Sequence, residues 1–294
     1  MVLPHLANGQ TITSLLSYLE LFAHIPHGQS WFLRMQNGLV LGENGQALSP
    51  DTPYAGGLRV YYYRHIPHEP RVPFEAQIVY QDAHLLVADK PHFLPVSPTG
   101  RYVQETLLVR LKRTTGLDDL VPIHRIDRDT AGLVMFSVQP SSRNAYAALF
   151  REHAIEKSYE AIAPYRKALD FPRIHRSRLV PGESFMQMQE VTSPAHLANS
   201  ETHIALLEHN GAQGLYSLQP ITGKRHQLRV HMMALGIPIA GDHIYPVMRP
   251  EPDVAALDYS QPLQLLAKKI TFTDPVTRCE HTLVSQRKLG GFSL

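Results

Sequence analysis

The sequence predicts an α+β fold, in which a mixed and mainly antiparallel sheet has helices at its flanks. Segments with the alternating pattern of strands and segments with helical spacing follow one another without an internal repeat. Two pairs of adjacent strand-like segments are separated only by short turn sequences, which is typical of antiparallel hairpins. No glycine-rich phosphate loop or dinucleotide-binding fingerprint occurs among them. We therefore expect a sheet built largely from neighbouring hairpins.

The first half of the main domain contains one predicted hairpin, two helices and one apolar strand. QIVYQD and HLLVADKP predict the hairpin, with an Asp-Ala pair at its turn, and a helix is expected near residues 103–114. The apolar run LVMFS after Gly132 predicts a strand. A second helix is expected from about Ser142 to His153, where the serines at its start are suited to cap it.

The second half continues with strands and one more helix. KSYEAIA predicts a strand, and ETHIALLEHNGAQGLYSLQPIT predicts a hairpin that turns at Asn210 and Gly211. A helix is expected from about Arg225 to Leu235, with Gly236 placed to end it. Residues 164–200 are rich in Pro, Ser and Arg and lack periodicity. We expect them to form a surface insertion that influences substrate specificity.

The chain is expected to divide into a small module, residues 1–72, and a main domain, residues 73–294. The module combines an apolar helical pattern in ITSLLSYLELFAHI with short strands, so a small α/β-type unit is expected. The Pro-rich stretch IPHEPRVPFE is expected to act as the linker. Turn signals separate the short strands at Asn37-Gly38, Asn44-Gly45 and Gly56-Gly57.

Composition excludes some classes of protein and favours others. The single cysteine, Cys279, rules out an internal disulfide framework and a Cys-rich zinc site. The N-terminus has no apolar stretch long enough to span a membrane, so we expect a cytoplasmic protein without a membrane partner. Between residues 143 and 178 there are eight Lys or Arg residues and four acidic residues. This patch is either a phosphate-binding surface or an ordinary solvated face.

One segment, VPIHRIDRDTAGLVMFS, places Asp127 between a His-Arg pair and a Thr-x-Gly turn. Gly132 permits a tight turn or a positive φ, and the apolar strand after it would anchor the loop on a sheet. Asp127 would therefore have rigid support, as a catalytic nucleophile requires. The residues alone also fit a structural salt-bridge cluster of His124, Arg125 and Asp127 at a sheet edge.

A second segment, GKRHQLRVHMMALGIPIAGDHIY, concentrates basic side chains and closes with glycines. Together with HRIDRDTAG, EKSYEAIA and VYQDAHLLVADKPHFLPVSPTG, it resembles the RluA-type pseudouridine synthases, with all four motifs in order over about residues 74–290. Ala131 stands where the family often has serine, and Ile126 where it often has leucine. Residues 1–72 loosely resemble a degenerate S4-like module, a small RNA-binding appendage of some members.

The resemblance implies a catalytic domain of the pseudouridine synthase type that isomerises specific uridines of ribosomal or transfer RNA after base flipping. It implies no cofactor and no metal. Asp127 would be the nucleophile, and Arg225 would pair with it and keep it charged. Tyr159 would stack on the uracil, although without the resemblance it would be interpreted as a core tyrosine.

Four further residues are implied as substrate-binding. Arg125 would contact the opened RNA, Lys157 would add positive charge, and His124 and His226 would form hydrogen bonds that hold the loop. A non-catalytic RNA-binding protein with the same fold is the main alternative. A histidine-rich metal hydrolase is disfavoured, because His226 and His231 are five residues apart and helical neighbours are four apart. We expect a monomer.

Overall fold

The computed structural model describes residues 1–5, 12–22, 30–62, 69–184, 186–191, 197–249 and 257–290. The chain divides into two compact units, of which the first contains residues 1–70 and 99–104, and the second contains residues 71–98 and 105–294. Among the described residues, no helix is long and apolar enough to cross a membrane.

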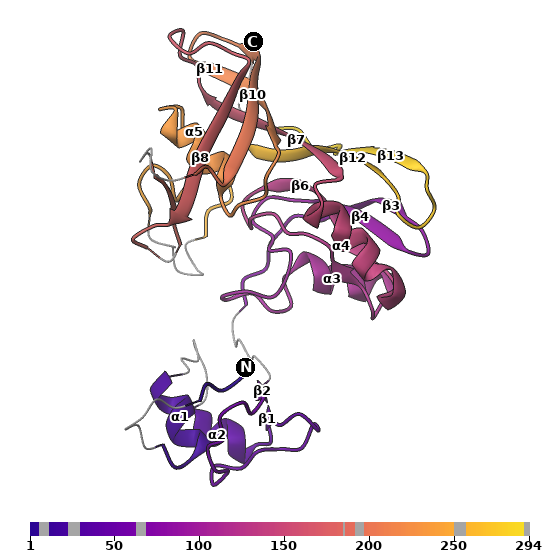
Figure 1. Ribbon diagram of the computed structural model, residues 1–294, viewed down its shortest axis with the longest axis vertical. Coiled ribbons are helices and arrows are strands. Elements are labelled where there is room, and N and C mark those ends of the chain that lie inside the picture. Colours follow the sequence, from indigo (N-terminus) through magenta and orange to yellow (C-terminus); the bar gives the residue numbers. More distant parts are fainter. Residues whose placement is uncertain are drawn as a thin grey trace. The chain divides into compact units, whose positions relative to one another are not determined.

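The first unit is a small α/β module (Figure 1). Its elements are α1 (Leu15–Phe22), α2 (Trp31–Gln36), β1 (Val40–Leu41) and β2 (Tyr61–Tyr62), and the two strands pair antiparallel. Apolar side chains from both helices and from β1 share one core that includes Leu15, Leu19, Trp31 and Val40. The predicted helical pattern extended to Ile25, which lies outside the described residues. The likeness to an S4 module stays a prediction.

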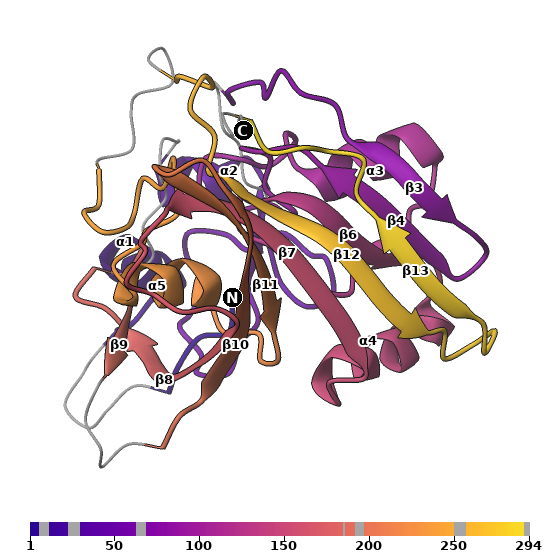
Figure 2. The same cartoon turned by 90° about the horizontal axis from the view of Figure 1, so that it is seen from above.

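The second unit is built on one mixed sheet of eleven strands among the residues described. Its strands are β3 (Gln77–Gln81), β4 (Leu85–Lys90), β5 (Val121–Pro122), β6 (Ala131–Ser137), β7 (Ile155–Pro164), β8 (Arg173–Pro181), β9 (Met188–Val191), β10 (Ser200–His209), β11 (Gln213–Pro220), β12 (Leu265–Thr273) and β13 (Glu280–Val284). The strand order is β3-β4-β6-β12-β7-β11-β10-β8-β9 (Figure 2). In addition, β13 pairs with β12, and β5 pairs with β6. Of these pairs, β6–β12 is parallel and the others are antiparallel. The predicted mixed, mainly antiparallel α+β fold is confirmed.

Helices cover two separate cores of this sheet. The helices of the second unit are α3 (Leu107–Thr115), α4 (Arg143–Arg151) and α5 (Gln227–Ala234). A 3-10 turn, η1 (Pro140–Ser142), directly precedes α4. Helix α4 packs on β4 and β6, and α5 packs on β10 and β11 (Figure 1). Strand β7 contributes Ile155 to the first core and Ala161 to the second. Because side chains alternate along a strand, the residues between these two on the same face lie between the two cores.

Most predicted elements are present, with three corrections. Residues 164–200, which we expected to form a surface insertion, contribute to the sheet, because they contain β8, which pairs with β10, and β9, which pairs with β8. Ser142 does not cap α4, since its hydroxyl donates to the Gln139 carbonyl at 3.1 Å. Helix α5 begins two residues later than predicted, because His226 has a left-handed backbone conformation with φ 54°.

The junction of β6 with β12 fixes the end of the loop that carries Asp127. Gly132 has φ +110°, and a Cβ placed there would lie 2.3 Å from the Ala267 carbonyl oxygen. A side chain is therefore incompatible with this close approach. Residues 123–130, here called the Asp127 loop, run from β5 directly into this junction. The loop is anchored at the middle of the sheet.

Candidate active site

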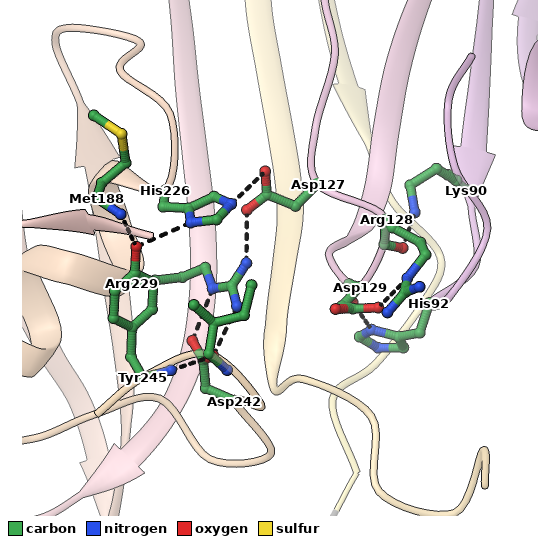
Figure 3. A network of polar contacts seen from close by, with 11 residues as sticks. Lys90, His92, Asp127, Arg128, Asp129, Met188, His226, Arg229, Asp242 and Tyr245 are labelled. Atoms are coloured by element: carbon green, nitrogen blue, oxygen red, sulfur yellow. Dashed lines mark hydrogen bonds and ion pairs between the residues drawn. The ribbon is translucent and has the colours of Figure 1, made fainter. Parts of the chain in front are cut away.

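The Asp127 carboxylate is half-buried, with 30% of its side chain exposed. The Thr130 amide donates to the Asp127 carbonyl at 3.2 Å, which closes a turn in the loop. Figure 3 shows the carboxylate with two groups of side chains, one on each side of the loop. The first group contains Arg229, Asp242, His226 and Tyr245, of which Arg229 and His226 lie against the carboxylate itself.

Arg229 forms the ion pair with Asp127. Its Nη1 donates to Asp127 Oδ2 at 3.1 Å, while Nε and Nη2 both donate to Asp242 at 2.7 Å (Figure 3). Asp242 also accepts the Ile244 and Tyr245 amides at 2.8 and 3.0 Å, so its position is fixed by the main chain. Burial disfavours the guanidinium, but the hydrogen bonds to Asp242 and the charge of Asp127 raise the Arg229 pKa above its ordinary value. Arg229 is therefore a fixed cation aimed at Asp127.

The structure corrects the predicted partner of Asp127. We expected Arg225 to form this ion pair, but Arg229 forms it. Arg225 is exposed and lies before α5, whereas Arg229 is the third residue of the helix and is buried. The left-handed turn at His226 separates the two arginines. In a helix that began at Arg225, as predicted, either arginine could have formed the ion pair with Asp127.

Two polar side chains of α5 hold the helix in the orientation that Arg229 needs. Gln227 donates to the Glu201 carbonyl at 2.9 Å and to Thr202 Oγ1 at 3.0 Å. His231 bonds Thr202 through Nδ1 at 2.9 Å, and its Nε2 lies 3.0 and 3.1 Å from the hydroxyls of Ser200 and Ser177. Buried polar side chains that are fully bonded specify one arrangement. These polar side chains of the segment HQLRVH therefore attach α5 to β8 and β10.

His231 also belongs to the one cluster of His, Cys, Asp or Glu side chains among the described residues that is close enough to share a metal ion. The others are His175 and Glu190, and the possible ligand atoms lie within 4.8 Å of one another. Both ring nitrogens of His231 already bond hydroxyl groups, and His175 Nε2 lies 2.8 Å from Glu190 Oε2. These internal bonds account for the cluster without a metal.

His226 lies beside the carboxylate. Its Nε2 is 3.8 Å from Asp127 Oδ1, and its Nδ1 is 3.0 Å from the Tyr245 hydroxyl. Burial lowers the His226 pKa, and the negative charge of Asp127 acts against this. The ring is therefore neutral at neutral pH. The predicted proximity of His226 to the loop has a specific geometry, although its role in binding stays a prediction.

Tyr159 and Lys157 lie on β7, on the same face as the residues of the two cores. Tyr159 packs against the core beneath α5. Burial and the nearby charge of Asp127 raise the Tyr159 pKa, so the phenol keeps its proton at neutral pH. Burial lowers the Lys157 pKa. The structure therefore brings Tyr159 into the electrostatic environment of Asp127.

His124 is part of the Asp127 loop and attaches it to β6 and α4. Its Nε2 accepts the Met135 amide at 3.1 Å, and its ring stacks on Phe150 with centroids 4.5 Å apart. Burial, followed by the charge of Lys157, lowers the His124 pKa to about 3. A neutral, stacked imidazole suits the loop-holding role expected for His124. Arg125, next to it, is exposed.

The second group of side chains holds the main chain of the loop from its other side (Figure 3). Lys90 is completely buried and its Nζ donates to the carbonyls of Arg128 and Pro91 at 2.9 and 2.8 Å. His92 Nδ1 donates to the Asp129 carbonyl at 2.7 Å, and Arg128 Nε donates to the Asp129 carboxylate at 2.9 Å. Burial lowers the Lys90 pKa to about 7. The sequence did not predict this group, and its only signal there was a lysine at the end of the predicted strand HLLVADKP.

The second unit resembles known proteins in sequence and in structure. Residues 84–234 match the family model described as RNA pseudouridylate synthase. The dual-specificity RNA pseudouridine synthase RluA of Haemophilus influenzae is 31% identical over 216 residues, which are 72% of this chain and 93% of the relative. An uncharacterized RNA pseudouridine synthase of Synechocystis is 28% identical over 74% of each chain. The structure of human RNA pseudouridylate synthase domain containing 4 has a TM-score of 0.54 and 27% identity, covering 72% of this chain and 88% of that one.

Proposed function

Because the chain belongs to the RluA-type family of RNA pseudouridine synthases, isomerases that convert uridine to pseudouridine in RNA, we propose that Asp127 is its catalytic carboxylate. The substrate class that we propose is uridine in structured ribosomal or transfer RNA. The observation that carries the proposal is the partly exposed Asp127 carboxylate, 3.1 Å from a buried arginine that Asp242 clamps.

The reaction moves one glycosidic bond and one proton. The bond from N1 to C1′ breaks, the uracil turns, C5 bonds to C1′, and the proton leaves C5 while N1 gains one. Asp127 would act by attack at C1′, by attack at C6 or through a glycal intermediate, and each route needs an ionised carboxylate. Arg229 supports that ionised form, because a fixed cation at 3.1 Å favours the negative charge.

The other residues would prepare the uridine. We propose that the ring of Tyr159 stacks on the flipped uracil, since it packs beside the core beneath α5 and lies near the charge of Asp127. The exposed Arg125 would contact the opened RNA, and Lys157 would add positive potential. We further propose that the protein acts as a monomer in the cytoplasm, and that residues 1–72 help to orient the RNA.

A map of pseudouridines tests the function. Total RNA is compared between cells with and without the gene, and the deleted strain is complemented with wild type or with Asp127→Asn. We expect specific sites to vanish on deletion and to return only with wild type, which would also identify the RNA. Sites that also return with Asp127→Asn would refute the role of the carboxylate. An unchanged map together with RNA binding by the purified protein would favour the non-catalytic alternative.

A further inference from the structure

We propose that Tyr245 is a positioning residue that couples the imidazole of His226, and through it the Asp127 carboxylate, to the hairpin of β8 and β9. The proposal rests on the proposed catalytic role of Asp127. It assigns to Tyr245 no contact with the substrate. Its effect is on the orientation of groups that are already in the site.

The Tyr245 hydroxyl stands between two elements of the fold. The residue is 3% exposed, and its hydroxyl accepts the Met188 amide at 2.7 Å. The same oxygen lies 3.0 Å from His226 Nδ1 (Figure 3). Met188 is the first residue of β9, and His226 directly precedes α5. One buried hydroxyl therefore joins the hairpin to the start of the helix that carries Arg229.

The direction of these bonds selects one form of the imidazole. An amide N–H can only donate, so the hydroxyl accepts from Met188. Among the described residues His226 Nδ1 is the other hydrogen-bond partner of this oxygen, so we assign the hydroxyl proton to that bond. A neutral imidazole that accepts at Nδ1 carries its proton on Nε2. That nitrogen lies 3.8 Å from Asp127 Oδ1. The hydroxyl thus directs an N–H toward the carboxylate rather than a lone pair.

Other groups around His226 set its electrostatic environment but do not select the nitrogen that carries the proton. Asp127 and Asp242 favour a cationic ring, while Arg229 and Arg225 oppose it. Burial adds to the opposition, and the ring stays neutral. The Tyr245 ring meets the imidazole edge-on, with centroids 5.7 Å apart. The hydroxyl bond is therefore the directional contact in this environment.

The hairpin has two further attachments to the turn that contains Tyr245. Gln187 Nε2 donates to the Ile244 carbonyl at 3.2 Å, and Met188 packs with Tyr245 and Val230 in one apolar cluster. Among the residues that the structure describes, β9 is the last strand of the sheet order. An edge strand is open to a macromolecular partner on one side. A shift of β9 on RNA contact would move the Met188 amide and alter the hydroxyl that orients His226.

The first test observes the imidazole directly and needs no enzymatic activity. In wild-type protein, ¹⁵N NMR of labelled histidines is expected to show His226 as the Nε2–H tautomer, with its signals assigned by comparison with His226→Gln. Tyr245→Phe is expected to lose this single tautomer. Tyr216→Phe is the matched control, because it removes a hydroxyl that donates to the Pro164 carbonyl at 3.0 Å elsewhere in the unit. It is expected to leave the His226 signals unchanged.

The second test separates positioning from RNA binding. In single-turnover assays, Tyr245→Phe is expected to lower the rate about tenfold, as loss of one orienting hydrogen bond permits, with an RNA dissociation constant within about twofold of wild type. His226→Gln is expected to lower the rate similarly, and the double variant to be no slower than the slower single variant. Gln187→Ala loosens the hairpin and is expected to lower the rate about threefold.

The outcomes distinguish the link from the function on which it rests. An unchanged His226 tautomer in Tyr245→Phe would overturn the link, and so would rate losses that multiply in the double variant. A Tyr245→Phe protein with the stability and rate of Tyr216→Phe would show an ordinary structural hydroxyl. If wild type forms no pseudouridine in any RNA but the tautomer changes as expected, the proposed function fails while the coupling of Tyr245 to His226 stands.

Discussion

The two sides of the Asp127 loop hold it by different kinds of contact. On one side, Arg229 and His226 lie against the carboxylate itself, at 3.1 and 3.8 Å. On the other side, Lys90 and His92 donate to main-chain carbonyls of the loop. The first side therefore acts on the charge of the carboxylate, and the second acts on the position of its backbone. Substitutions on the two sides are therefore expected to impair the protein in different ways.

The largest effect is expected at the carboxylate. Asp127→Asn removes the negative charge of the proposed catalytic carboxylate. It is expected to lower turnover by about 10⁴-fold or more, with RNA binding and folding nearly unchanged. Single-turnover kinetics with RNA-binding and thermal-unfolding measurements check this. Asp129→Asn is the control, because that buried carboxylate pairs with Arg128 and is expected to lose stability but keep measurable turnover. Equal turnover by the two variants would contradict the assignment.

The second effect concerns the clamp on the carboxylate side. Arg229→Met leaves the buried Asp242 carboxylate unpaired and is expected to lower the free energy of unfolding by about 3–5 kcal/mol. Turnover is expected to fall by about a hundredfold. The double variant Arg229→Met/Asp242→Leu removes both buried charges and is expected to recover stability but not turnover. Recovery of both in denaturation and kinetic assays would mean that Arg229 serves only the fold.

The third effect concerns Lys90 and depends on pH. Burial lowers the Lys90 pKa from 10.5 to about 7. Between about pH 7 and about pH 10 the unfolded chain binds this proton and the folded chain does not, so the free energy of unfolding rises with pH across that window. Below it, the whole cost of the buried ammonium is present. Urea denaturation is expected to show wild type gaining stability relative to Lys90→Met as pH rises.

Turnover by Lys90→Met tests the same side of the loop. We expect a loss of about tenfold, because the carbonyls of Arg128 and Pro91 lose their donor and the loop shifts slightly. The RNA dissociation constant is expected to stay near that of wild type. If the free energies of unfolding of the two proteins changed in parallel from neutral to alkaline pH, folding would not lower the pKa of Lys90.

The smallest effect is expected at Arg225. This exposed arginine lies outside the clamp, so Arg225→Ala is expected to leave the single-turnover rate within about twofold of wild type. RNA binding is expected to weaken by only a few-fold, and the salt dependence of binding to fall by about one phosphate contact. Binding isotherms over a range of salt concentrations check this. A rate loss as large as that of Arg229→Met would restore our original assignment.

Local patterns were sufficient to predict much of the sheet. Both hairpins, β3–β4 and β10–β11, follow from alternation and turn residues, and Asp82 accepts the amides of the tight turn as such residues do. Strand β8 was missed because its buried positions include Ser177, whose hydroxyl bonds another strand rather than joining an apolar pattern. Burial of a polar side chain depends on partners distant in the sequence.

The site was predictable in its residues and less so in their pairing. Asp127, Tyr159 and His226 were identified from motifs and lie near one another. Whether Arg225 or Arg229 pairs with Asp127 depends on one left-handed residue directly before α5. Helical periodicity in the sequence does not indicate that residue. Lys90 was missed because its partners are carbonyls, one of them 38 residues away. Main-chain acceptors leave no trace in a side-chain pattern.

The position of β12 in the sheet has a consequence for the order in which the protein is made. This strand, residues 265–273, lies between β6 and β7, although both precede it by more than a hundred residues. A nascent chain that ends before residue 265 contains the Asp127 loop on one half of the sheet, and Tyr159 and Arg229 on the other, without the strand that joins them. Chains without residues 265–273 therefore lack the strand that joins the two halves of the proposed site.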